Sequence, residues 1–231
     1  MKNVLKILIV IGLIIASIGI LFIGQGYKMY KDAVKEVSIE TKINEIREQE
    51  DYTKISDVPE MYKKAVVSVE DHRFYKHHGI DVIAIGRATL NDLRAFSFVE
   101  GGSTITQQLA KNQYFTQEKK MTRKIAETFL AFKLEKEYEK DEILELYINT
   151  IYFGNGYYGI KEASMGYFGK LPKDLTDSEC IMLAGIPNAP SVYALTENPD
   201  LAKQRQKQVL AKMIRYKALT EEEAKNILNS N

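Results

Sequence analysis

The sequence has little of what disulfide frameworks, histidine metal sites and nucleic-acid binding require. It contains one cysteine, Cys180, which stands in an apolar run, and three histidines, all between residues 72 and 78. One cysteine excludes a disulfide within the chain, so we expect a buried, unreactive thiol. The formal net charge is only +1 over 231 residues. Whole-chain charge therefore predicts no nucleic-acid partner, and any anion site must come from local clustering.

Charge is also absent from the N-terminal segment, where residues 7–24 contain no charged side chain. A helix over this run covers about 27 Å, close to the thickness of a hydrocarbon core. Lys2 and Lys6 precede the run, so the positive-inside rule places the N-terminus in the cytoplasm and the rest outside. A cleaved signal peptide is the alternative, but the run is long for one. We expect residues 1–26 to be a cytoplasmic tip and an uncleaved, single-pass anchor.

The remaining chain lacks a sustained strand pattern, repeats and low-complexity segments. Only residues 146–153 show a brief strand-like alternation. Residues 27–55 mix charged and apolar side chains, which predicts a helical stalk or, alternatively, a solvated linker. Residues 56–231 are expected to form one mainly α domain. Helix starts are predicted at Pro59, Asp81, Thr122, Asp141 and Asn198-Pro199, with capping boxes at Thr104, Thr176 and Thr220.

The stretch "VEDHRFYKHHG", residues 69–79, contains all three histidines. Their spacing does not match a zinc motif and no other histidine could complete one, so we expect no metal site. Glu70 is expected at the end of a helix, in a mixed-charge turn beside aromatic residues. A carboxylate in that position suits a general base. A solvated charged turn is the alternative.

The stretch "GGSTITQQLAKN", residues 101–112, begins a helix. Thr104, Gln108 and Lys111 stand at i, i+4 and i+7, which lines up a hydroxyl, an amide and an ammonium. A helix N-terminus attracts anions through its free N–H groups. The alternative is a capped helix with a solvated polar face.

The stretch "KKMTRKIAETFLAFKLE", residues 119–135, reads as a helix that is apolar on two faces. Glu127 lies on the same stripe as Leu130 and Leu134, so its carboxylate must be paired if it is buried, with Arg123 as the local partner. A purely structural ion pair is the alternative. Residues 111–124 contain one acidic side chain, Glu118, and five basic ones: Lys111, Lys119, Lys120, Arg123 and Lys124. This basic patch suits an anion or a membrane surface.

Together with "ELYINTIYFGNGYYGI" and "LAGIPNAPS", these stretches resemble the ordered motifs of the peptidoglycan glycosyltransferases. This family comprises the transglycosylase module of class A penicillin-binding proteins and the monofunctional transglycosylases. The resemblance spans about residues 55–195. It implies a lysozyme-like helical lobe with a smaller membrane-proximal lobe. We expect the apolar stretch around Phe96 and Phe98 to dip into the membrane, so replacing both by Ser should weaken liposome binding.

The resemblance implies polymerisation of lipid II into β-1,4 glycan strands, with inversion and release of undecaprenyl pyrophosphate. Glu70 matches the catalytic base, and Glu127 matches a second essential glutamate that steadies Arg123, Lys124 and the donor. No cofactor is required, although Mg²⁺ or Mn²⁺ at the substrate pyrophosphate is compatible with the family. The substrate-binding residues that it implies are Asp71, Phe74, His77, Arg87, Ser103, Thr104, Gln108, Lys111, Arg123 and Lys124.

The implied partners are lipid II, the growing glycan chain, the bacterial cytoplasmic membrane and a cell-wall synthesis or division complex, with the catalytic domain on the extracytoplasmic face. No S-x-x-K, S-x-N and K-T-G set follows the last motif, so we expect no transpeptidase module. Two alternatives are a lysozyme-type lytic enzyme and a non-catalytic membrane scaffold. A lytic enzyme has no need of the basic cluster, and a scaffold would tolerate Glu70→Gln.

Overall fold

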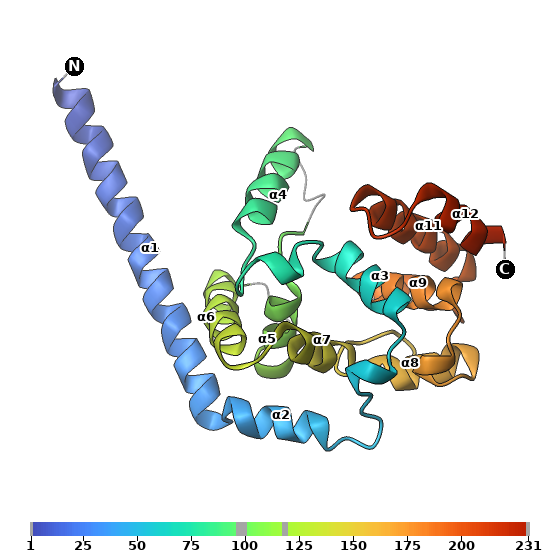
Figure 1. The fold of residues 1–231 in the computed structure, drawn as a ribbon. Helices are drawn as coiled ribbons and strands as arrows, with labels where there is room; N and C mark the ends of the chain where they lie inside the picture. The colour runs from blue at the N-terminus through green and yellow to red at the C-terminus, as the bar shows by residue number, and fades with distance from the viewer. Residues whose placement is uncertain (1, 96–100, 117–119, 230–231) are drawn as a thin grey trace.

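A computed structural model describes residues 2–95, 101–116 and 120–229. Over these residues the chain folds into α-helices joined by short loops and 3-10 turns (Figure 1). The described ranges contain two isolated β-bridges, His78 with Ile80 and Tyr152 with Tyr158, and no longer strand. The prediction of a mainly α protein is confirmed.

The brief strand expected within residues 146–153 is wrong. Leu146, Tyr147 and Ile148 belong to helix α7 (Lys140–Ile148), and all three are fully buried. A helix that is apolar over consecutive buried residues has no polar face to reveal its period, so a short stretch of it resembles a strand.

Helix α1 (Lys2–Glu36) extends away from the rest of the molecule (Figure 1). Its apolar residues before position 24 are mostly solvent-exposed, and its length and composition allow it to cross a membrane. Its C-terminal half packs on helix α6 (Met121–Glu137). There Gly26 is buried, and Tyr27 and Tyr30 lie against the ring of Phe129.

Residues 27–55 are mainly helical. Helix α1 continues to Glu36, and helix α2 (Ile39–Arg47) follows. Ile39, Ile43 and Ile46 of α2 are buried in the main hydrophobic core. Segment α2 is therefore packed against the globular part, whereas the predicted division into anchor, stalk and domain stays a prediction.

The globular part contains two groups of packed helices. Helix α3 (Glu60–Glu70) contacts α9 (Asp177–Gly185) and α11 (Pro199–Arg215), and helix α5 (Ile105–Tyr114) lies between α6 and α7. Cys180 of α9 is buried, and burial raises the pKa of its thiol to about 12, as expected for an unreactive cysteine. The remaining helices are α8 (Gly159–Phe168), α10 (Pro190–Tyr193) and α12 (Glu221–Asn229).

Helix α4 (Val82–Ala95) projects toward the same side of the molecule as the N-terminal half of α1 (Figure 1). Asp81 begins it, because its carboxylate accepts hydrogen bonds from the amides of Ile83 and Ala84. Its large apolar side chains are exposed, whereas the small side chain of Ala88 is buried. The expected membrane-dipping residues Phe96 and Phe98 and the basic residue Lys119 lie outside the described residues.

Candidate active site

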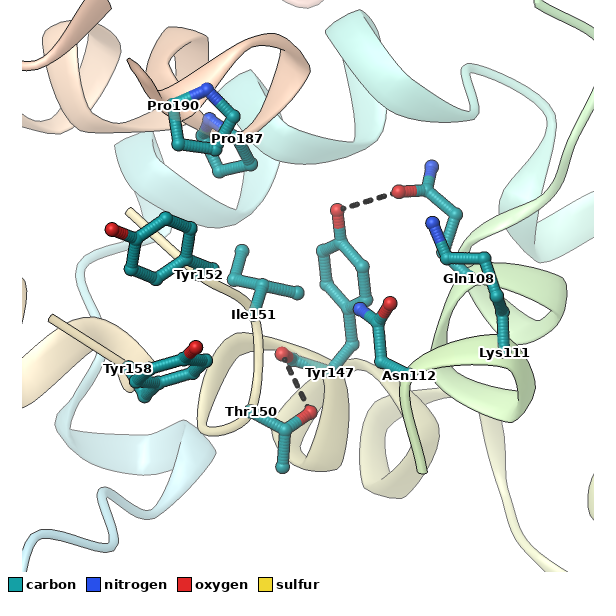
Figure 2. A pocket seen from close by; sticks show the side chains of 10 residues that line it. All are labelled: Gln108, Lys111, Asn112, Tyr147, Thr150, Ile151, Tyr152, Tyr158, Pro187 and Pro190. Carbon is teal, nitrogen blue, oxygen red and sulfur yellow. Dashed lines mark hydrogen bonds between the residues drawn. The ribbon is translucent and has the colours of Figure 1, made fainter. Parts of the chain in front are cut away.

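Glu70 is the last residue of α3, and its carboxylate is held by a side chain of α5. The amide Nε2 of Gln108 donates to Glu70 Oε2 at 2.8 Å. Figure 2 shows the other hydrogen bond of this amide, in which the hydroxyl of Tyr147 donates to Gln108 Oε1 at 3.4 Å. Because Tyr147 engages the amide oxygen, the amide nitrogen faces Glu70. The arrangement suits an ionised carboxylate, which can only accept hydrogen bonds.

Behind Glu70, the buried carboxylate of Asp71 fixes the turn to the start of α5. His77 Nε2 lies 2.9 Å from Asp71 Oδ2, and the backbone N–H of Ile105 donates to the same oxygen at 3.1 Å. Phe74 is completely buried beside this pair. Asp71, Phe74 and His77 were predicted to bind substrate. Here they form the support of the turn, and their contact with substrate stays a prediction.

The predicted capping box at the start of α5 is present. The Thr104 hydroxyl accepts from the Gln107 amide at 3.1 Å and donates to the Gly79 carbonyl at 2.7 Å. Thr104 is buried, and both hydrogen bonds of its hydroxyl are made inside the protein. Gln108 and Lys111, in contrast, line the cleft described below. Of the three side chains expected to face one ligand, Gln108 and Lys111 do line the cleft, whereas Thr104 does not.

Glu127 is buried on α6, with its side chain only 1% exposed. Arg123 Nη1 lies 3.1 Å from Oε1, and Lys124 Nζ lies 2.9 Å from Oε2. Lys124 also donates to the hydroxyl of Ser103 at 2.7 Å. The predicted Arg123–Glu127 ion pair is thus present, and Lys124 is a second cation on the same carboxylate.

Lys111 connects this ion pair to Glu70. Burial lowers the pKa of its ammonium, Arg123 and Lys124 lower the pKa further, and Glu127 and Glu70 oppose them. Glu127, Arg123, Lys124 and Glu70 therefore all lie within electrostatic reach of Lys111. Over the described ranges, the side-chain ammonium of Lys111 makes no hydrogen bond or ion pair. Three cations, Lys111, Arg123 and Lys124, stand against the two carboxylates Glu127 and Glu70, so this region keeps a positive surplus that suits an anion.

Two adjoining pockets form a cleft, and they share Gln108, Lys111 and Pro187. The larger, of about 690 Å³, we call the basic pocket. Glu70 and Arg87 lie in its wall, and the ring of His72 stacks on Tyr216 at 3.8 Å. The smaller, of about 500 Å³, we call the aromatic pocket (Figure 2). Its lining includes Tyr147, Tyr152, Tyr158, Pro187 and Pro190.

The far wall of the basic pocket contains residues that sequence reasoning missed. Arg205, Lys212 and Arg215 come from α11, beyond the last recognisable motif. Arg205 is 8% exposed and donates to the Gly185 carbonyl at 3.2 Å. Spacings of seven and three residues place the three on one side of a helix, but solvated helix faces show the same spacing. Only the packing of α11 on α3 and α9 brings them to the cleft.

The cleft offers cations rather than metal ligands. In the described part of the chain, no group of three or more His, Cys, Asp or Glu side chains is arranged to hold a metal ion. Both oxygens of Glu127 face basic side chains. These residues do not form a site for Mg²⁺ or Mn²⁺ by themselves, and a cation carried in with the substrate stays an expectation.

Comparison with known families gives one match, to the model described as "Transglycosylase", over residues 38–214. This range contains Glu70, Glu127 and the whole lining of the aromatic pocket, and it begins just before α2. Of the basic pocket, Arg215 and Tyr216 lie just beyond it.

Several curated proteins are similar over most of this chain. Penicillin-binding protein 1F of Bacillus subtilis is 50% identical over 159 residues, which cover 69% of this chain and 22% of that protein. Penicillin-binding protein 1A of Neisseria gonorrhoeae is 46% identical over 182 residues, which cover 79% and 23% respectively. Penicillin-binding protein 2D of Bacillus subtilis is 46% identical, with 75% and 25% covered. The chain thus spans about a quarter or less of the length of these relatives.

Among solved structures, penicillin-binding protein 1A from Haemophilus influenzae aligns over 78% of this chain and 17% of its own. The sequence identity is 23% and the TM-score is 0.47. A likeness at this level says nothing about the site.

Proposed function

Because the chain belongs to the transglycosylase family, we propose that it is a peptidoglycan glycosyltransferase that polymerises lipid II into β-1,4 glycan strands. The observation that carries the proposal is the shared cleft of Glu70 and Lys111, with the charged groups of α6 beside Lys111. A single base close to a surplus of cations matches a reaction in which an alcohol attacks and a diphosphate leaves.

In the proposed reaction, Glu70 removes the proton from the 4-hydroxyl of the acceptor GlcNAc. That oxygen forms a bond to the anomeric carbon of the donor MurNAc, and the bond from this carbon to the pyrophosphate oxygen breaks. The electron pair leaves with undecaprenyl pyrophosphate, so the α-linked donor becomes a β-linked product. A hydroxyl is a weak nucleophile at neutral pH, which is why a positioned base is required.

The cations of α5 and α6 stabilise the departing pyrophosphate. Lys111 has no internal partner among the described residues, and Arg123 and Lys124 share Glu127. Fixed cations in a partly buried site stabilise developing negative charge without reorganising. In this proposal Glu127 acts by holding Arg123 and Lys124 in place, and Ser103 orients the Lys124 ammonium.

The membrane places the lipid substrate beside this cleft. In the proposal α1 is a single-pass anchor with its N-terminus in the cytoplasm, and the catalytic domain works on the extracytoplasmic face. The exposed apolar side chains of α4 then face the lipid. Recruitment to a cell-wall synthesis or division complex belongs to the same proposal.

A lytic enzyme would share a helical fold and a catalytic carboxylate, but cleavage inside a glycan strand uses no diphosphate site. Incubation with lipid II and, separately, with purified sacculi distinguishes the two reactions. We expect lipid II to be consumed into polymer and sacculi to stay intact. Release of fragments from sacculi without consumption of lipid II would contradict the proposal.

A further inference from the structure

The loop from Tyr152 to Tyr158 holds two aromatic rings side by side at the cleft. The chain reverses through Gly154, Asn155 and Gly156, whose φ angles of 84°, 52° and 83° are all positive. The isolated bridge between Tyr152 and Tyr158 closes this reversal, and the Gly156 amide donates to the Tyr152 hydroxyl at 3.3 Å. As a result the two ring centroids lie 4.8 Å apart, with their planes 38° from parallel.

The pair lies across the aromatic pocket from the catalytic groups. Figure 2 shows Tyr152 and Tyr158 on the opposite side from Gln108 and Lys111. Tyr158 is 60% exposed, so its ring is accessible to a ligand from solvent. Two of the three left-handed residues are glycines and the third is asparagine, which are the residue types that adopt this conformation most readily, so the sequence itself encodes the tight reversal. Such a loop is typical of a site that presents a side chain to a ligand.

The two pockets differ in charge. Lys111, shared by both, is the only charged residue in the lining of the aromatic pocket over the described ranges. The basic pocket adds Arg87, Arg205, Lys212 and Arg215. An anionic group therefore fits the basic pocket better, and a neutral ligand with flat apolar faces fits the aromatic pocket.

We propose that Tyr152 and Tyr158 form a platform for a pyranose ring of the glycan substrate, across the aromatic pocket from Gln108. The C–H face of a pyranose is apolar and carries a small positive charge, whereas the face of a tyrosine ring is negative. Pro187 and Pro190 supply further flat apolar surface on the same pocket. This inference rests on the proposed function, since it assigns the sugar of that reaction to one arm of the cleft.

The test uses the full chain in detergent with lipid II as substrate. Replacing Tyr158 by Ala is expected to raise KM for lipid II roughly five- to tenfold, as for loss of one aromatic contact, with kcat within about twofold. Tyr158→Phe keeps the ring and is expected to behave as wild type. Leu171→Ala is the control for loss of a large exposed side chain, because Leu171 is 41% exposed and lines neither pocket.

A second measurement needs no turnover. Saturation-transfer NMR with a β-1,4-linked GlcNAc–MurNAc tetrasaccharide that carries no lipid or pyrophosphate is expected to show contact with wild type and little with Tyr158→Ala. Unchanged KM and unchanged saturation transfer in Tyr158→Ala would overturn the platform. A wild type that binds the tetrasaccharide but makes no polymer would instead contradict the proposed function and leave the platform supported.

Discussion

At the scale of single residues, the site depends on charges that are costly to bury. Glu127 is compensated by two basic partners, and Glu70 by the Gln108 amide. Lys111 has no such partner among the described residues, and burial lowers the pKa of its ammonium. A half-buried cation that has no direct hydrogen-bond or ion-pair partner is typical of a group that is retained for binding an anion.

Replacing Lys111 by Met should therefore raise the thermal unfolding midpoint while lowering polymerisation by about 100-fold or more. Between the lowered pKa of folded Lys111 and its unfolded value of 10.5, the unfolded chain binds more protons. The free energy of unfolding consequently increases with pH between these two pKa values. Below the lowered pKa, the cost of burying the charged Lys111 ammonium is fully present. The gain in the Met variant should be largest at neutral pH and should shrink as the pH approaches 10.5. Thermal scans from pH 7 to 10 measure it.

Lys136→Met is the control, because Lys136 is exposed near the end of α6. It should change neither the unfolding midpoint nor the rate. An active Lys111→Met variant, or one with a lower midpoint at pH 7, would show that Lys111 serves the fold rather than the substrate.

At the scale of helices, the contact between α1 and α6 links the anchor to the site. A Cβ atom added to Gly26 would lie 2.5 Å from Ile125 Cγ2 and 2.9 Å from the Thr122 carbonyl oxygen. These positions flank Arg123 and Lys124 on the same helix. The absence of a side chain at residue 26 thus lets α1 approach the helix that holds the cations.

Gly26→Val should force α1 and α6 apart. We expect a destabilisation of about 1–3 kcal/mol, as for overpacking, and a polymerisation rate reduced roughly tenfold. Gly24→Val is the matched control, since a Cβ at Gly24 would meet nothing within 4 Å. Thermal unfolding and lipid II turnover of both variants provide the comparison. If both lose activity equally, α1 acts only as an anchor.

Local chemistry explains which elements could be predicted from the sequence. The capping boxes at Thr104 and Thr176 and the i, i+4 pair of Arg123 and Glu127 depend on neighbours within one helical turn, and all are present. The position of the α11 residues Arg205, Lys212 and Arg215 at the basic pocket, and the position of Tyr152 across the aromatic pocket from Gln108, depend on how distant helices pack. No pattern within one segment determines that packing.

At the scale of the whole molecule, α1 and α4 point to one side (Figure 1). On α4, Val82, Ile83, Leu90 and Leu93 are between 56% and 71% exposed. Exposed apolar side chains clustered on one helix indicate an interaction surface. Because α1 would lead into the membrane on that side, we expect lipid to cover α4.

A fluorophore at Leu93→Cys tests this arrangement, since the buried Cys180 thiol, with a pKa of about 12, should not be labelled. In liposomes with brominated lipids, the label at residue 93 should be quenched. A label at Lys207→Cys, an exposed position on α11, should keep its emission. Equal emission at both positions would place α4 in water.

The central claim is that one carboxylate activates the acceptor while a second holds the cations of the leaving group. Polymerisation of lipid II by wild type, Glu70→Gln and Glu127→Gln tests it most directly, with circular dichroism to verify folding. The account predicts that both variants fold and lose about 100-fold or more of the polymerisation rate. A folded Glu70→Gln variant that polymerises lipid II at the wild-type rate would contradict it.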